Sequence, residues 1–147
     1  MDRLILVRDG RTIAEATERA TTWAARLRGL IGRTGLPSGA ALMLCPARQV
    51  HTFGMRFPID VIVCDRRLLV LHVARTLRPH RLTRFVRRGH YVFELPAGDA
   101  DGIVPGDGLA VITTGSDSCG RSTRAAVPVE SPRGGPRQRR SRDRRPR

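Results

Sequence analysis

The sequence predicts one α+β domain: a small, mainly antiparallel, barrel-like β domain with one N-terminal helix. Roughly seven or eight short stretches alternate or run apolar in the manner of strands, and links rich in Gly, Pro and Asp separate them. Only one stretch has helical spacing. Because few links are long enough for a crossover, most neighbouring strands should pair antiparallel.

The N-terminal elements are a hairpin and then the helix. Apolar residues on both sides of Asp9-Gly10 predict the hairpin, since Asp-Gly is a strong turn signal. Thr21 and Thr22 can cap a helix that ends near Leu30 or Gly32. Its predicted core stripe repeats every three or four residues: Trp23, Leu27, Leu30 and Ile31.

The later elements follow from apolar runs and turn signals. Pro79 to Gly89 is a basic loop, and Asp99 to Ile103 is a candidate helical turn. Glu94 lies late in a strand, where we expect it to pair with a loop arginine or to be exposed. The predicted strands are Ala40 to Cys45, Ile59 to Cys64, Leu68 to Thr76, His90 to Leu95 and Leu109 to Thr113.

Residues 45–65 hold the closest grouping of Cys, His, Asp and Arg. From His51 to Phe57 apolar and polar residues alternate, which predicts a half-buried strand with His51, Phe53, Met55 and Phe57 on one face. Pro58 interrupts the ladder. Asp60 starts a buried run and needs a partner there, and Arg56 and His51 are the nearest candidates.

The chain has 147 residues and a net charge of +14, and all 27 basic residues are arginine. Residues 1–114 form the predicted domain, and residues 115–147 form an Arg-rich tail with too few apolar residues to fold. The tail is either a solvated extension or a weak contact for nucleic acid or an anionic surface. It has no aromatic residues for base stacking.

The cysteines and the apolar runs bear on location. Three cysteines without CxxC spacing indicate neither a disulfide framework nor a zinc site. No apolar run reaches the ~20 residues of a membrane helix, so no membrane span is predicted. The first residues lack the pattern of a signal peptide, and the expected location is cytoplasmic. No cofactor is predicted.

Five ordered blocks resemble the DUF192 (UPF0127) family over about residues 12–113: Arg28-Gly-Leu-Ile-Gly-Arg33, Ala41-Leu-Met-Leu44, His51 to Asp60, Glu94-Leu-Pro-Ala-Gly98 and Gly106-Asp107. The resemblance implies a compact β-rich fold of about this length, and it implies no particular reaction. Many members of that family carry an N-terminal signal sequence, from which this chain departs. The Arg-rich tail is also outside the family pattern.

A binding pocket is the favoured hypothesis for the site, with His51, Arg56 and Asp60 converging at the mouth of the barrel. Its ligand would be small and anionic or polar, because arginine offers a planar fork for carboxylate or phosphate. The predicted ligand-binding residues are His51, Thr52, Met55, Arg56, Asp60, Arg28 and Arg33. The protein would then be a non-catalytic binding or accessory module.

Three alternatives remain open on the sequence. An enzyme would use Cys45 or Cys64 as a nucleophile, with His51 as base and Asp60 orienting it. A metal site would use the same four side chains, but their spacing matches no strong metal motif, so none is predicted. In a purely structural role, Asp60 accepts hydrogen bonds from Arg56 or backbone amides, and the apolar neighbours are core.

Overall fold

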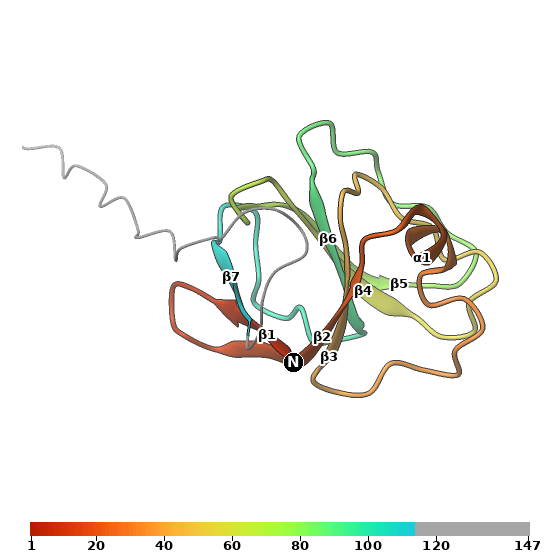
Figure 1. The fold of residues 1–147 in the computed structure, drawn as a ribbon, viewed down its shortest axis with the longest axis horizontal. Coiled ribbons are helices and arrows are strands. Elements are labelled where there is room, and N and C mark those ends of the chain that lie inside the picture. Colours follow the sequence, from red (N-terminus) through yellow and green to blue (C-terminus); the bar gives the residue numbers. More distant parts are fainter. Residues whose placement is uncertain (114–147) are drawn as a thin grey trace, which may run out of the picture.

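The computed structural model describes residues 1–113, whose regular elements are seven strands and one short helix (Figure 1). These are β1 (Asp2–Leu6), β2 (Thr12–Ala20), α1 (Trp23–Arg28), β3 (Ala40–Leu44), β4 (Ile59–Cys64), β5 (Val70–Leu77), β6 (Tyr91–Pro96) and β7 (Leu109–Ile112). The strands form one sheet in the order β5-β4-β6-β3-β2-β1-β7. The predictions for residues 115–147 lie outside the described residues.

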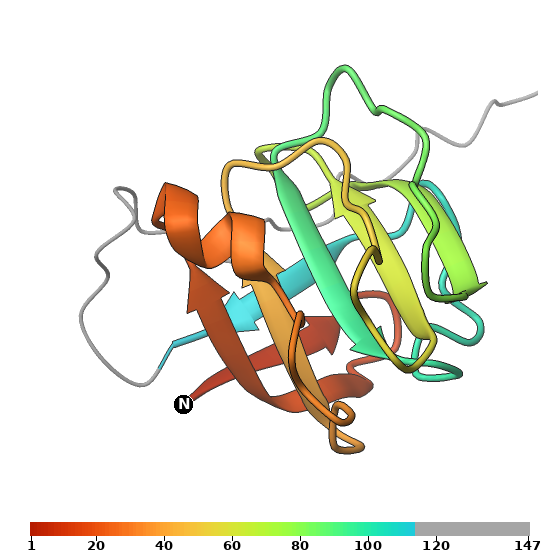
Figure 2. The ribbon, with the colours of Figure 1, turned by 90° about the vertical axis from the view of Figure 1, so that its right-hand side faces the viewer.

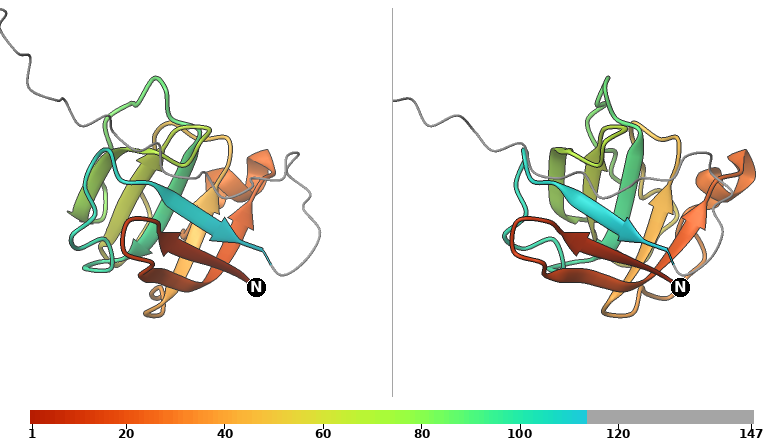
Figure 3. Two further views of the ribbon diagram at one scale, coloured as in Figure 1. Left: turned by 90° about the vertical axis from the view of Figure 1, so that its left-hand side faces the viewer. Right: turned by 60° about the vertical axis from the view of Figure 1, so that its left-hand side comes forward.

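The sheet curls into a half-barrel, so that its two ends approach each other (Figure 3). The segment before β5 meets the segment before β7 through an isolated bridge between Leu69 and Gly108. Two backbone hydrogen bonds flank it: Val70 N donates to Asp107 O at 2.8 Å, and Leu109 N donates to Leu68 O at 2.9 Å. These contacts join the two edge strands at one end only.

Pairing is antiparallel except between β2 and β3, which run parallel with Ala16 opposite Ala40 and Ala20 opposite Leu44. The connection between them carries α1, which lies at the carboxyl ends of both strands (Figure 2). The predicted mainly antiparallel, barrel-like sheet is therefore present in a half-closed form. The predicted α+β class overstates the helical content, because the described part of the chain is mostly β with one six-residue helix.

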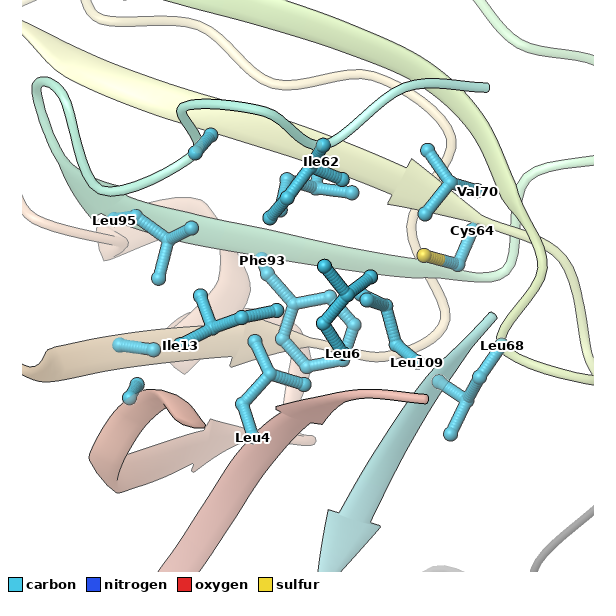
Figure 4. Close-up of a cluster of buried hydrophobic side chains, with 14 of the residues drawn as sticks. Leu4, Leu6, Ile13, Ile62, Cys64, Leu68, Val70, Phe93, Leu95 and Leu109 are labelled. Carbon is cyan, nitrogen blue, oxygen red and sulfur yellow. The ribbon is translucent and has the colours of Figure 1, made fainter. Parts of the chain in front are cut away.

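The sheet has two buried faces. Its concave face holds a core that includes Leu4, Leu6, Ile62, Phe93 and Leu95 (Figure 4). The convex face carries a second cluster, covered by α1 and the long loops, which includes Leu30, Leu42, Leu44, Met55, Val61 and Val92. Since neighbouring residues in a strand point to opposite faces, residue 60 shares the concave face with Ile62, and residue 94 shares the convex face with Val92.

Helix α1 begins as predicted and ends early. The Thr22 hydroxyl caps it by accepting a hydrogen bond from Ala25 N at 3.1 Å. Gly29 stops the helix because its φ of +48° is a conformation that few other residues adopt. Leu30 is buried as predicted, but Ile31 is 38% exposed, so the predicted core stripe does not extend to it.

Two local predictions are wrong. Residues 51–57 form turns instead of a strand, with only an isolated bridge between His51 and Leu82. The predicted alternation also fails at two positions, because Thr52 is fully buried and Phe53 is 50% exposed, whereas Met55 is buried as predicted. The cause is Thr52, whose hydroxyl donates to Arg78 O at 2.7 Å and accepts from Arg81 N at 2.9 Å. Residues 99–103 form successive turns and no helix.

Candidate functional site

A cavity of about 270 Å³ lies on the convex face of the sheet, between α1, the loop after β3 and strand β6. Its volume is at the small end of the range for small-molecule sites. Twelve residues line it: Arg26, Arg28, Gly29, Leu30, Ile31, Leu44, Pro46, Ala47, Gln49, Val50, His51 and Glu94. Apolar walls with a few polar groups are the usual composition of a ligand pocket.

Glu94 is the most buried charged residue in the lining, at 2% exposure. It lies on β6, in the interior of the sheet, opposite Leu42 on one neighbouring strand and Val61 on the other. Its Oε2 atom is completely buried and has no hydrogen-bond partner in the described structure. A carboxyl group left in this state is costly, because nothing replaces its lost hydration. The prediction that Glu94 pairs with a loop arginine or lies exposed was wrong.

Burial raises the pKa of Glu94 from 4.5 to about 7, against an opposing effect of the Arg33 charge. Near neutral pH the side chain is therefore divided between carboxylic acid and carboxylate. As an acid it donates one hydrogen bond, and as a carboxylate it only accepts.

Gly29 forms the wall of the cavity opposite the carboxyl group. A Cβ atom at this position would lie 3.7 and 3.8 Å from the two Glu94 carboxyl oxygens. The missing side chain therefore leaves Glu94 open towards the cavity. The same glycine ends α1, so the end of the helix and the opening of the pocket depend on one residue.

His51 supplies the second unpartnered polar atom. Its Nδ1 is buried and has no hydrogen-bond partner in the described structure. The ring stacks on Phe53, with 5.5 Å between centroids and 29° between planes. The bridge to Leu82 fixes the backbone of His51 from the other side. His51 and Glu94 thus present one buried polar atom each, and both residues line the same cavity.

The arginines near this cavity differ in what they bind. Arg26 is held by the carbonyl oxygens of Thr21 and Cys45, the latter at 3.2 Å. Arg33 forms a bidentate pair with Glu18, at 3.2 and 2.7 Å, which lowers the pKa of Glu18. Arg28 lines the cavity and is exposed, and its guanidinium group makes no hydrogen bond or ion pair with residues 1–113. Arg28 is therefore the cation available to a ligand.

Asp60 has a different environment from the one expected. Its carboxylate is fully buried on the concave face and accepts three backbone hydrogen bonds, from Thr76 N at 2.7 Å, Gly98 N at 2.9 Å and Ala100 N at 3.0 Å. These amides, and not Arg56 or His51, are its partners. Asp60 joins three segments of the fold and does not line the cavity.

The other predicted ligand-binding residues are dispersed. Arg56 is exposed, Thr52 binds the loop at residues 78–81, and Met55 is buried in the convex-face core. None of the three lines the cavity. The structure thus brings together His51 and Arg28 from the predicted set, and it adds Glu94. The signal for Glu94 in the sequence was a lone carboxylate within an apolar strand pattern.

The cysteines do not form the nucleophile–base pair with His51 that the enzyme alternative requires. Cys45 is buried, and its Sγ lies 3.6 Å from Nε2 of His90. Cys64 is buried in β4, and burial, with the nearby Asp65 charge, raises the pKa of its thiol far above the usual range. Within residues 1–113, no three His, Cys, Asp or Glu side chains are grouped as metal ligands would be.

No helix within residues 1–113 is both long and apolar enough to cross a membrane.

Comparisons with known proteins agree with this architecture. The crystal structure of a protein of unknown function from Novosphingobium aromaticivorans DSM 12444 has a TM-score of 0.65 at 21% identity, covering 74% of this chain and 82% of that one. A Sinorhizobium meliloti 1021 protein described as "a putative transcription regulator" has a TM-score of 0.64 at 23% identity, covering 75% and 91%. At these identities the likeness concerns the fold alone.

No curated protein matches the sequence. The sequence model of one family, described as "Uncharacterized ACR", matches residues 5–111, which is most of the chain. The chain belongs to the DUF192 family.

Proposed function

We propose that this protein is a non-catalytic binding module whose convex-face cavity takes a small polar or anionic ligand. The observation that carries the proposal is the pair of buried, unpartnered polar atoms, Glu94 Oε2 and His51 Nδ1, on residues that line one cavity. Buried polar atoms almost always have partners in folded proteins. A bound ligand would supply the partners that the chain itself does not.

The polar groups define the chemistry of the ligand. Protonated Glu94 donates a hydrogen bond to a ligand oxygen, and His51 Nδ1 donates or accepts according to its tautomer. Arg28 can hold a carboxylate in its planar fork. Apolar contacts from Leu30, Leu44 and Val50 would cover the rest of the ligand. A short-chain carboxylic acid with a second oxygen function fits this arrangement.

The raised pKa of Glu94 makes the affinity for the ligand depend on pH. The donor form is present below about pH 7 and is lost above it. Ionised Glu94 would also repel an anionic ligand. Affinity for a carboxylate should therefore fall as the pH rises through 7.

A thermal-shift panel on the full chain tests the proposal, with acetate, lactate, succinate, acetamide and imidazole as probes. We expect at least one carboxylate to raise the melting temperature at pH 6 and to lose that effect at pH 8. Glu94→Leu should abolish the response without lowering the stability of the free protein, because the carboxyl group is held there at a cost.

Thr17→Val is the matched control. Thr17 also has a buried, unpartnered oxygen, but it does not line the cavity. This variant should keep the full response to the probe. A response that persists in Glu94→Leu, or a panel without any response at either pH, would refute the proposal.

A further inference from the structure

A second hollow, of about 970 Å³, lies at the end of the half-barrel where the two edges of the sheet meet. Five separate segments form it: the residues after β1, the loop after β3, the turn between β4 and β5, the approach to β6, and the approach to β7. Six arginines and two aspartates are among the lining residues: Arg8, Arg48, Arg66, Arg67, Arg87, Arg88, Asp65 and Asp107. We call this hollow the arginine cleft.

The two aspartates of the cleft are already engaged in shaping turns. Oδ1 of Asp65 accepts from the backbone amides of Arg67 and Leu69, at 2.7 and 3.0 Å. Asp107 accepts from Val104 N at 2.9 Å and from Arg8 at 3.1 Å. Arg8 is therefore the one cleft arginine with a carboxylate partner within residues 1–113.

The other five cleft arginines have no such partner. Arg48, Arg66, Arg67, Arg87 and Arg88 are all exposed, and their side chains make no hydrogen bond or ion pair with the described residues. Like charges gathered in one hollow repel each other, and the two carboxylates of the cleft balance only part of the six positive charges. An anionic ligand would remove that repulsion.

The backbone that carries these arginines is tightly fixed. A Cβ atom on Gly89 would lie 2.9 Å from Val63 Cγ1 and 3.3 Å from Arg48 Cα, so only glycine fits there. Backbone hydrogen bonds run from Val86 N to Arg48 O at 3.0 Å and from His90 N to Cys64 O at 2.8 Å. Three of the five segments are thus locked together, and the anchor points of the guanidinium groups are set by the fold.

His90 lines the same cleft, and its pKa responds to the positive charge of the cleft arginines. Burial, followed by the positive charges of Arg66 and Arg48, lowers the pKa of His90. The ring is therefore neutral at physiological pH and adds no charge. It is also the sole aromatic ring among the cleft-lining residues, so the cleft has no Phe, Tyr or Trp on which bases could stack.

We propose that the arginine cleft binds a linear chain of phosphate groups and recognises the phosphates themselves. Guanidinium groups match phosphate oxygens in bidentate geometry, and five of them, spread over three segments, exceed what one phosphate can engage. The lack of Phe, Tyr and Trp in the lining argues against recognition of bases. This site shares no lining residue with the cavity at Glu94, and all of its lining residues lie within residues 1–113.

Fluorescence anisotropy on the full chain tests the proposal, with a labelled single-stranded oligothymidylate as the probe. The cleft variant is Arg66→Gln/Arg87→Gln/Arg88→Gln. The control variant, Arg78→Gln/Arg81→Gln/Arg84→Gln, removes the same charge from exposed arginines outside the cleft and leaves the tail unchanged. We expect about tenfold or greater weakening in the cleft variant, and a slope of log affinity against log salt that is shallower by about 2.

The control variant should bind within about threefold of the wild type. Equal weakening of the two variants would place the affinity in the overall charge or in the tail and would overturn the proposal, as would a wild type that does not bind the probe.

Inorganic polyphosphate serves as a competitor and separates the two sources of a phosphate chain. Displacement of the oligonucleotide by polyphosphate is the expected result, since neither sugars nor bases are needed. Failure to displace it would show that the cleft reads the nucleotides, which contradicts recognition through phosphates alone.

Discussion

Asp60 and Glu94 are buried carboxyl residues on the adjacent strands β4 and β6, and they face opposite sides of the same sheet. Asp60 accepts hydrogen bonds from three backbone amides of two other segments. Oε2 of Glu94 has no hydrogen-bond partner within residues 1–113, and a glycine opposite the carboxyl group keeps a cavity open. The same chemical group is therefore structural on one face and available on the other.

This difference shows how to distinguish a structural carboxylate from a binding one. The cost of burying Asp60 is offset by charge-assisted hydrogen bonds that hold distant segments together. The cost of burying Glu94 is offset only in part, by the nearby charge of Arg33, and its pKa rises accordingly. A buried carboxyl group that destabilises the fold in this way indicates a role in binding or chemistry and not in folding.

The largest expected effect concerns Asp60. Asp60→Asn places an amide group against at least one backbone N–H, so a buried donor loses its acceptor. We expect the free energy of unfolding to fall by about 3 kcal/mol in urea denaturation of the full chain. Asp101→Asn, at a carboxylate that is 80% exposed, is the control and should change little. A tolerated Asp60→Asn would end the distinction between the two carboxyl groups.

The next effect is the pH dependence caused by Glu94. Its pKa is raised from 4.5 to about 7 on folding, so the folded protein holds the proton more tightly than the unfolded chain. The contribution of Glu94 to the free energy of unfolding should therefore be most favourable below pH 4.5. It should fall as the pH rises and level off above about pH 7. The shift corresponds to about 3 kcal/mol.

Glu94→Gln should remove this component. The gain in unfolding free energy of the variant over the wild type should therefore be larger at pH 8 than at pH 5, as measured by urea denaturation at both pH values. Glu15→Gln, at an exposed glutamate of β2, is the matched control. Parallel pH profiles for wild type and Glu94→Gln would contradict the assignment.

A smaller effect concerns Gly29. Gly29→Ala forces an alanine into a φ of +48° and places its Cβ beside the Glu94 oxygens. We expect a loss of about 1 kcal/mol in thermal or urea unfolding. Gly35→Ala, in open space and without a positive φ, should be nearly neutral. Equal effects of the two changes would show that the opening opposite Glu94 does not depend on glycine.

The smallest effect concerns Thr17, whose buried hydroxyl also lacks a partner. Thr17 does not line the cavity that contains Glu94. Thr17→Val should therefore raise the free energy of unfolding by about 0.5 kcal/mol at every pH. Urea denaturation at pH 5 and pH 8 would measure it. A pH-dependent gain would mean that Thr17 is coupled to Glu94, contrary to the geometry.

The regular parts of this fold could be predicted because their residues carry periodic signals. The continuous apolar run of β4 and the Asp-Gly turn of the first hairpin are local features, and both are present. The alternation from His51 to Phe57 had the same period as a strand, yet Thr52 binds residues 78–81 instead. A partner so distant in sequence leaves no local signal.

The site was harder to predict for a related reason. His51 and Arg28 were identified as polar residues near an apolar region, and they do line the cavity. Asp60 was grouped with them because it is close in sequence, but the pleat of β4 turns it to the opposite face. Glu94 was passed over because its burial comes from strands β3 and β4 on either side and from α1 above it.

A titration of the Glu94 side-chain carboxyl carbon by ¹³C NMR, in the full chain without ligand, tests the central claim most directly. The account predicts a pKa of about 7, well above the 4.5 of an exposed glutamate, and a change in that pKa when a carboxylate probe binds. A pKa near 4.5 would show that the Glu94 carboxylate is already solvated or paired. It would contradict the proposal that this cavity binds a small polar or anionic ligand.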